Sequence, residues 1–166
     1  MNKTFSILLL SIWFCLFTSA WIRVYNLDGT EVKLEDNTTH LIICYHPACC
    51  HECMNDIVLF CRKVASISEN CKYAVLINGD DPMRMHMETS LLEEYLTDTS
   101  NVPILYDSNP NKKNRIFYRY RKKIQHSPSL LIIDSQKQYH FFSYESLFED
   151  KQGFTKISRL IEITDE

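Results

Sequence analysis

The most informative segment of the chain is Leu41-Ile42-Ile43-Cys44-Tyr45-His46-Pro47-Ala48-Cys49-Cys50-His51-Glu52-Cys53. Its apolar first half predicts a fully buried strand. Apolar residues then recur at helical spacing from Glu52 to Ser68, which predicts an amphipathic helix. Between the two, Cys50 and Cys53 form a C-x-x-C pair beside the helix N-terminus, whose partial positive charge favours the thiolate that attacks disulfides. The stretch therefore predicts a redox-active dithiol, with Cys50 and Cys53 as catalytic residues.

Alternating strands and helices follow from the pattern on either side of this stretch. Asp28-Gly29 is a turn signal, so Ile22–Tyr25 and Thr30–Leu34 are expected to form a hairpin. Further strands are expected at 40–45, 73–77, 102–106, 129–134 and 138–143, and further helices at 87–96, 111–122 and 148–163. This order predicts an α/β domain with a mixed central sheet flanked by helices on both faces. The dithiol would lie at the C-terminal end of a central strand, where open α/β sheets place their sites.

Composition narrows the class of protein. A chain of 166 residues has room for one domain with a real core, and its 45% hydrophobic fraction is ordinary for a globular protein. A net charge of −3 gives no electrostatic reason to expect nucleic acid as a partner. The basic and aromatic run Phe117–Arg121 is interpreted as a solvated helix face with a few core rings.

The N-terminus has the three-part pattern of a secretory signal peptide. Lys3 supplies a positive charge, Phe5 to Phe17 is uncharged and apolar, and Thr18-Ser19-Ala20 is a small-residue cleavage site. We expect residues 1–20 to be removed after Ala20 and residues 21–166 to form a secreted or periplasmic domain. An uncleaved membrane anchor is the alternative, and the only expected membrane contact. Lipidation of Cys15 is disfavoured by the bulky residues before it.

Three motifs, taken in order, resemble the secreted TlpA-like thioredoxins. The hairpin Asp28-Gly29-Thr30-Glu31-Val32-Lys33-Leu34 matches the family's D-G-x-x-V-x-L, and Cys50-His51-Glu52-Cys53 matches its C-x-x-C. Pro128-Ser129-Leu130-Leu131-Ile132-Ile133-Asp134 matches its P-x-x-x-L-I-D. The resemblance runs from about Val24 to the C-terminus and implies a thioredoxin-like fold with an N-terminal hairpin. It also implies an additional strand and helix between Gly79 and Lys122, as secreted members carry.

The resemblance implies a thiol-disulfide oxidoreductase that acts on protein thiols and disulfides together with an unidentified redox partner. Cys50 would attack, Cys53 would resolve, and no cofactor beyond the redox-active disulfide would be needed. Pro128 would be the cis-proline that faces the cysteines and leaves the Ser127 backbone free to pair with an extended substrate. His51 and Glu52 would support the site. His51 either stabilises the thiolate or is inert, and both interpretations stay open.

The sequence departs from the family's pattern at three positions. Cys49 stands where the family usually has Trp, Cys44 where a polar or acidic residue often lies below the dithiol, and Val75 near the place of thioredoxin's buried lysine. The proton-handling groups for the resolving cysteine are therefore not visible, which leaves Glu52 or an ordered water to substitute.

Other interpretations of the cysteines compete with the redox prediction. Cys49, Cys53 and His126 together resemble the C-x-x-x-C and distant histidine of Sco-type copper chaperones, since thiolates and imidazole suit copper. Pro128 argues against that alternative, and metal binding is not the expected function. Cys44, Cys61 and Cys71 are expected in the core, with a Cys61–Cys71 disulfide as a lesser alternative. A peroxidase is disfavoured because the Thr-x-x-Cys context is absent.

Overall fold

The structure is a computed structural model that describes residues 22–47, 50–96, 102–124, 128–148 and 153–162. The expected signal segment, its cleavage after Ala20 and Cys15 lie outside these ranges and stay predictions. Within the described ranges, no helix is long and apolar enough to cross a bilayer.

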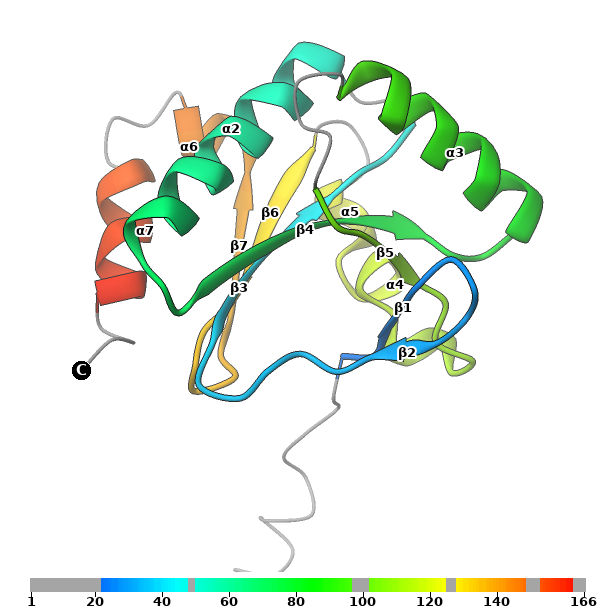
Figure 1. Ribbon diagram of the computed structural model, residues 1–166, viewed down its shortest axis with the longest axis horizontal. Helices are drawn as coiled ribbons and strands as arrows, with labels where there is room; N and C mark the ends of the chain where they lie inside the picture. Colours follow the sequence, from blue (N-terminus) through cyan, green and yellow to red (C-terminus); the bar gives the residue numbers. More distant parts are fainter. Residues whose placement is uncertain (1–21, 48–49, 97–101, 125–127, 149–152, 163–166) are drawn as a thin grey trace, which may run out of the picture.

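One mixed sheet of seven strands, in the order β2-β1-β5-β4-β3-β6-β7, forms the centre of the molecule (Figure 1). The strands are β1 (Val24–Tyr25), β2 (Glu31–Val32), β3 (Thr39–Cys44), β4 (Cys71–Asn78), β5 (Ile104–Asp107), β6 (Ser129–Ile133) and β7 (Tyr139–Ser143). The central strand β3 pairs parallel with β4 and antiparallel with β6. The predicted α/β class and mixed sheet are confirmed.

Helices cover both faces of the sheet. They are α2 (His51–Ile67), α3 (Pro82–Tyr95), the 3₁₀ turn η1 (Lys112–Asn114), α4 (Ile116–Arg119), α5 (Arg121–Ile124), α6 (Tyr144–Phe148) and α7 (Gly153–Glu162). Figure 1 shows the long helices α2 and α3 on one side of the sheet and the short α4 and α5 on the other.

Each face has its own hydrophobic core, because successive side chains of a strand point to opposite faces. Leu41 and Ile43 of β3 belong to the first core, which is covered by α2, α3, α6 and α7. Ile42 and Cys44 belong to the second core, which is covered by α4 and α5. A fully buried β3 explains why its sequence reads as a continuous apolar run rather than an alternating one.

The predicted hairpin and the predicted additional strand are both confirmed. Together they form one side of the sheet, in the order β2-β1-β5. Gly29 takes φ +82°, a left-handed conformation that glycine adopts without strain, and Asp28 Oδ1 accepts a hydrogen bond from Thr30 N at 2.9 Å. β1 then pairs with β5 through Tyr25 and Tyr106, so β5 connects the hairpin to β4. Pro103 lies directly before the first residue of β5, a strand that has neighbours on both sides.

Three predicted helices differ from the observed ones. α3 begins at Pro82 rather than at 87, because Asp81 caps it by accepting a hydrogen bond from Met83 N at 3.0 Å. The helix predicted over 111–122 is divided into η1, α4 and α5, because Arg115 is extended and donates through Nε to the Asn109 carbonyl at 2.6 Å. The helix predicted from 148 is preceded by α6, which begins directly after β7.

Candidate active site

Strand β3 and helix α2 position the two predicted catalytic cysteines. β3 ends at Cys44, and α2 begins at His51 with Cys50 as its N-cap residue. The Cys50 sulfur accepts a hydrogen bond from Cys53 N at 3.4 Å, and the Cys50 carbonyl accepts one from Met54 N at 3.1 Å. The first cysteine of the pair therefore occupies the position where an anion satisfies the unpaired N–H groups of a helix.

The two thiols differ in exposure and acidity. Cys50 is exposed, and the Cys53 thiol, followed by the Cys53 backbone N–H, is the main cause that lowers the pKa of Cys50. Cys53 is half-buried, and burial raises its pKa to about 11, with the neighbouring Cys50 adding to the shift. Both cysteines are free thiols. This asymmetry suits an attacking thiolate at Cys50 and a resolving thiol at Cys53 that ionises late.

Tyr144 and Asp56 are site residues that the sequence analysis missed. The Tyr144 hydroxyl, at the start of α6, donates a hydrogen bond to Asp56 Oδ2 at 2.8 Å. The same hydroxyl and the Cys53 thiol are near enough to shift each other's pKa. Its contact with Cys53 lowers the pKa of that thiol. Asp56 lies three residues after Cys53 on α2, so both side chains share one helix face. That i,i+3 spacing was a signal available in the sequence.

The described part of the chain includes three of the four predicted supporting residues: His51, Glu52 and Pro128. Glu52 and His51 are exposed in the first turn of α2. The backbone of Glu52 lowers the pKa of Cys50 and the charge of Glu52 raises it, and the supporting roles of both residues stay predictions. Pro128 is buried directly before β6, whose first residue, Ser129, pairs with Cys44. That register brings Pro128 to the same end of the sheet as Cys50. Ser127 lies outside the described residues, so the isomer of its bond to Pro128 stays a prediction.

The remaining cysteines are placed as predicted. Cys44, Cys61 and Cys71 are buried, and all three are free thiols, so the alternative Cys61–Cys71 disulfide is not formed here. Burial and the nearby Cys71 raise the pKa of Cys61 well above its usual range, which makes it an unreactive core thiol.

The copper alternative depends on Cys49 and His126, which both lie outside the described residues. Among the residues that are described, no three His, Cys, Asp or Glu side chains gather into a group that would hold a metal ion. The alternative therefore stays a prediction.

We compared the chain and its fold with known proteins. No family model and no curated protein matches the chain. Among solved structures, a secreted disulfide oxidoreductase of Mycobacterium tuberculosis matches with a TM-score of 0.52 and 14% identity, over 87% of this chain and 96% of that one. A thiol-disulfide oxidoreductase of Bacteroides fragilis matches with a TM-score of 0.57 and 12% identity, over 83% and 95%.

An exposed lipoprotein thioredoxin of Streptococcus pneumoniae matches with a TM-score of 0.53 and 16% identity, over 84% of this chain and 97% of that one. At such identities the likeness is one of fold. Together with the sheet order and the dithiol at the N-terminus of α2, it shows that the chain has the thioredoxin-like fold.

Proposed function

We propose that this protein is a thiol-disulfide oxidoreductase that exchanges disulfides with protein substrates outside the cytoplasm. The observation that carries the proposal is the Cys50–Cys53 pair, in which an exposed N-cap thiol accepts a hydrogen bond from the backbone of a half-buried partner thiol. Free thiols in that arrangement need no cofactor other than the dithiol itself.

The exchange proceeds in two displacements. The Cys50 thiolate attacks one sulfur of a substrate disulfide, a Cys50–substrate disulfide forms, and the other substrate sulfur leaves as a thiolate that takes a proton from water. The Cys53 thiolate then attacks the Cys50 sulfur, and the second substrate thiolate leaves. The substrate gains two electrons, and Cys50 and Cys53 become a disulfide. The reverse sequence oxidises a substrate dithiol.

The second displacement requires a base, because Cys53 has a pKa of about 11. Tyr144 and Asp56 provide one through the hydrogen bond that joins them. The Cys53 thiol gives its proton to the Tyr144 oxygen while the Tyr144 proton passes to Asp56 Oδ2. Asp56 is exposed and releases the proton to water. This pair replaces the polar residue and the lysine whose expected places hold Cys44 and Val75.

The location and the subfamily belong to the proposal as well. The apolar segment before Ala20 supports export, and two of the structural matches are described as secreted or exposed. The hairpin that begins at Asp28 and the Pro128 motif support the TlpA-like subfamily.

Reduction of insulin disulfides in the presence of dithiothreitol tests the function. We expect Cys50→Ser to reduce the rate to background, and Cys53→Ser to accumulate a mixed disulfide that a non-reducing gel resolves. Cys49→Ser is the matched control, because Cys49 is outside the proposed pair, and it should retain the activity. Wild-type turnover in both Cys50→Ser and Cys53→Ser would overturn the proposal.

The same variants distinguish the copper alternative. That alternative predicts stoichiometric Cu(I) binding by the wild type, with loss of binding in Cys49→Ser and in His126→Ala and no insulin reduction. The oxidoreductase proposal predicts instead that Cys49→Ser reduces insulin at the wild-type rate.

A further inference from the structure

A basic surface lies on α4, α5 and the turn before them, and the proposed chemistry does not use it. Residues 112–123 hold seven of the chain's 18 Lys and Arg residues and none of its 21 Asp and Glu residues. Arg115 is engaged by Asp80 and by the Asn109 carbonyl. The basic surface consists of the other six side chains, which are all exposed: Lys112, Lys113, Arg119, Arg121, Lys122 and Lys123.

These six charges are not neutralised by any ion pair with the described part of the chain. Two of them lie over aromatic rings, Arg121 at 5.5 Å from the centre of Tyr118 and Lys123 at 5.2 Å from that of Phe141. A ring contact orients a cation but leaves its charge in place. The surface therefore carries a concentrated positive field on a protein whose net charge is negative.

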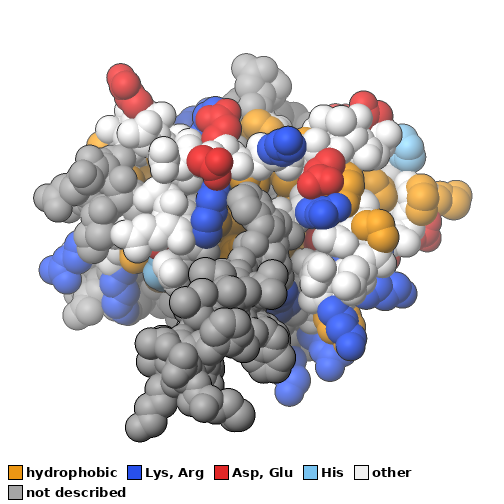
Figure 2. All heavy atoms as spheres, turned by 90° about the horizontal axis from the view of Figure 1, so that it is seen from below, with side chains coloured by type: hydrophobic (Ala, Val, Ile, Leu, Met, Phe, Trp, Pro, Cys, Tyr) orange, Lys and Arg blue, Asp and Glu red, His pale blue; other side chains and the backbone are white. Residues whose placement is uncertain are grey.

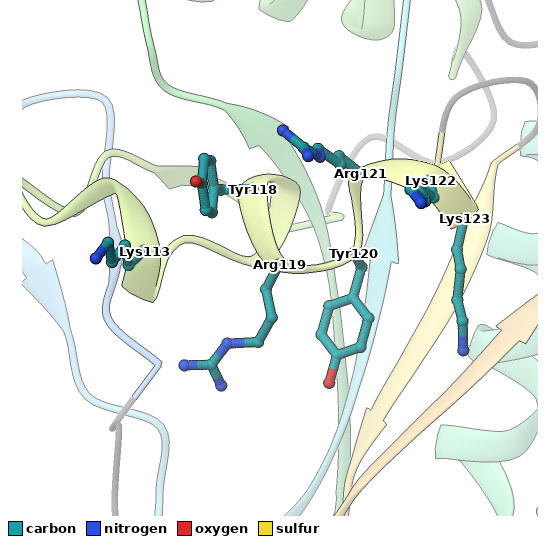
Figure 3. A pocket seen from close by; sticks show the side chains of 7 residues that line it. All are labelled: Lys113, Tyr118, Arg119, Tyr120, Arg121, Lys122 and Lys123. Carbon is teal, nitrogen blue, oxygen red and sulfur yellow. The ribbon is translucent and has the colours of Figure 1, made fainter.

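The basic surface contains a hollow, and the segment that forms it is anchored to the second core. An open hollow of about 460 Å³ is lined by Lys113, Tyr118, Arg119, Tyr120, Arg121, Lys122 and Lys123 (Figure 3). In that view Arg119, Tyr120 and Lys123 point to one side of the chain, and Tyr118 and Arg121 to the other. The buried side chains of Ile116, Phe117 and Ile124 anchor the segment to the second core, so the backbone that carries the charges is held against the sheet.

The N-terminal end of the domain lies on the same face of the sheet. Ile22, the first described residue, packs against the second core, and so does Tyr120 of the basic segment. The sequence that precedes Ile22 contains the uncharged stretch Phe5–Phe17. Figure 2 shows Lys and Arg side chains gathered toward the lower right of the face seen from below. In the alternative in which the N-terminal segment is not cleaved, its insertion into a bilayer would bring this face of the domain toward the lipid headgroups.

We propose that the basic surface docks on the anionic phospholipid headgroups of a membrane. Clusters of four to eight Lys and Arg bind such surfaces, and tyrosines favour the same interfacial depth. Single-stranded nucleic acid fits less well, because it needs free aromatic faces for base stacking. One face of Tyr118 is covered by Arg121, and one face of Tyr120 stacks on Phe141 with centroids 5.2 Å apart. This proposal is independent of the redox function.

Vesicle co-sedimentation of the full chain tests it. We compare vesicles of phosphatidylglycerol and phosphatidylcholine in equal parts with vesicles of phosphatidylcholine alone. The apolar N-terminal stretch would bind both, so the basic surface accounts for the difference between them. We expect stronger binding to the anionic vesicles and a steep loss of that difference on adding salt.

Two charge-reversal variants distinguish an effect of the basic surface from an effect of the protein's net charge. The first is Arg119→Glu with Lys122→Glu and Lys123→Glu, and we expect it to lose about tenfold or more of its affinity for anionic vesicles. The matched control is Lys63→Glu with Lys156→Glu and Arg159→Glu, on α2 and α7, which changes the net charge equally. It should retain affinity within about twofold.

Three outcomes would overturn the proposal: no preference of the wild type for anionic vesicles, equal losses in both triple variants, or tighter binding of a single-stranded oligonucleotide than of vesicles at equal phosphate. Thermal unfolding of both variants at the wild-type temperature verifies that they are folded.

Discussion

The two faces of the sheet are built in different ways. The first core is covered by long helices, with 17 residues in α2 and 14 in α3, and the dithiol lies at the N-terminus of the longest. The second core is covered by α4 and α5, which have four residues each. A long helix aligns many peptide dipoles toward one end, whereas a single turn aligns few. The first face therefore suits the proposed thiolate chemistry. The second face carries exposed charges on short helices that buried side chains anchor.

The way each helix begins shows the same difference. The N-cap residue of α2, Cys50, accepts a hydrogen bond from within the helix, and that cap is also the reactive group. Arg115, at the N-cap of α4, makes no such side-chain bond. Asp107 of β5 performs this role instead and accepts a hydrogen bond from Phe117 N at 2.8 Å. The second face thus depends on a buried carboxylate that comes from another element.

The largest expected effect concerns that carboxylate. Asp107 is 1% exposed, and burial raises its pKa from 3.8 to about 7. Between these two values the folded state binds a proton that the unfolded state has lost. The free energy of unfolding should therefore fall as the pH rises from about 4 to about 7, by at most about 4 kcal/mol.

Asp107→Asn isolates this contribution, since its amide oxygen still accepts the bond from Phe117 N. Urea unfolding at pH 4 to 8 should show that the variant gains stability relative to the wild type as the pH rises. A difference between the two proteins that stays constant across this range would contradict the assignment.

The second prediction concerns the unfolding free energy lost when one buried side chain is truncated in each of the two cores. Ile57 of α2 and Ile124 of α5 are both almost fully buried, at 0% and 2% exposed. We expect Ile57→Ala to cost about 3.5 kcal/mol of unfolding free energy and Ile124→Ala about 2 kcal/mol, because a four-residue helix collapses more readily into the cavity. Equal losses in urea unfolding would show that the two faces are packed with the same rigidity.

The smallest effect concerns proton transfer at the dithiol. Tyr144→Phe keeps the ring contact with Phe148, whose centroid is 4.8 Å away, but removes the hydroxyl that lowers the pKa of Cys53. We expect resolution of the mixed disulfide to slow about tenfold at neutral pH, and the rise of the rate with pH to move to higher pH, because fewer Cys53 thiols are ionised.

Stopped-flow kinetics of mixed-disulfide resolution measures this effect, with the exposed Tyr118→Phe as a control expected to be unchanged. Asp56→Asn should shift the pH profile in the same direction as Tyr144→Phe. A slower rate without any shift of the profile would indicate a structural role only.

Local patterns were enough to predict most of the first face. The apolar run at 40–45 and the helical spacing from Glu52 predicted β3 and α2 closely, because both are dictated by continuous burial or by one buried stripe. The C-x-x-C at their junction follows from the same two elements. The position of the candidate pair Cys50 and Cys53 at this junction could therefore be predicted without any tertiary information.

The second face was predicted less well. A single helix was expected over 111–122, where the structure has three short turns. Periodicity could not reveal the break, because the break depends on the extended Arg115 and on a cap from Asp107 in a different strand. The start of α6 was missed for a related reason: a five-residue helix gives too little sequence for a periodic pattern to emerge.

Local sequence patterns were sufficient to predict the strands, the long helix and the position of the dithiol, because hydrophobic periodicity and helix capping act over a few neighbouring residues. Which groups lie beside that dithiol depends on tertiary packing. Tyr144 and Asp56 are 88 residues apart, and they meet because β7 returns the chain to the face that carries α2. Tertiary packing likewise brings the basic segment and Ile22 against the same core. Packing against a sheet joins residues that are far apart in the sequence, so no local pattern predicts such contacts.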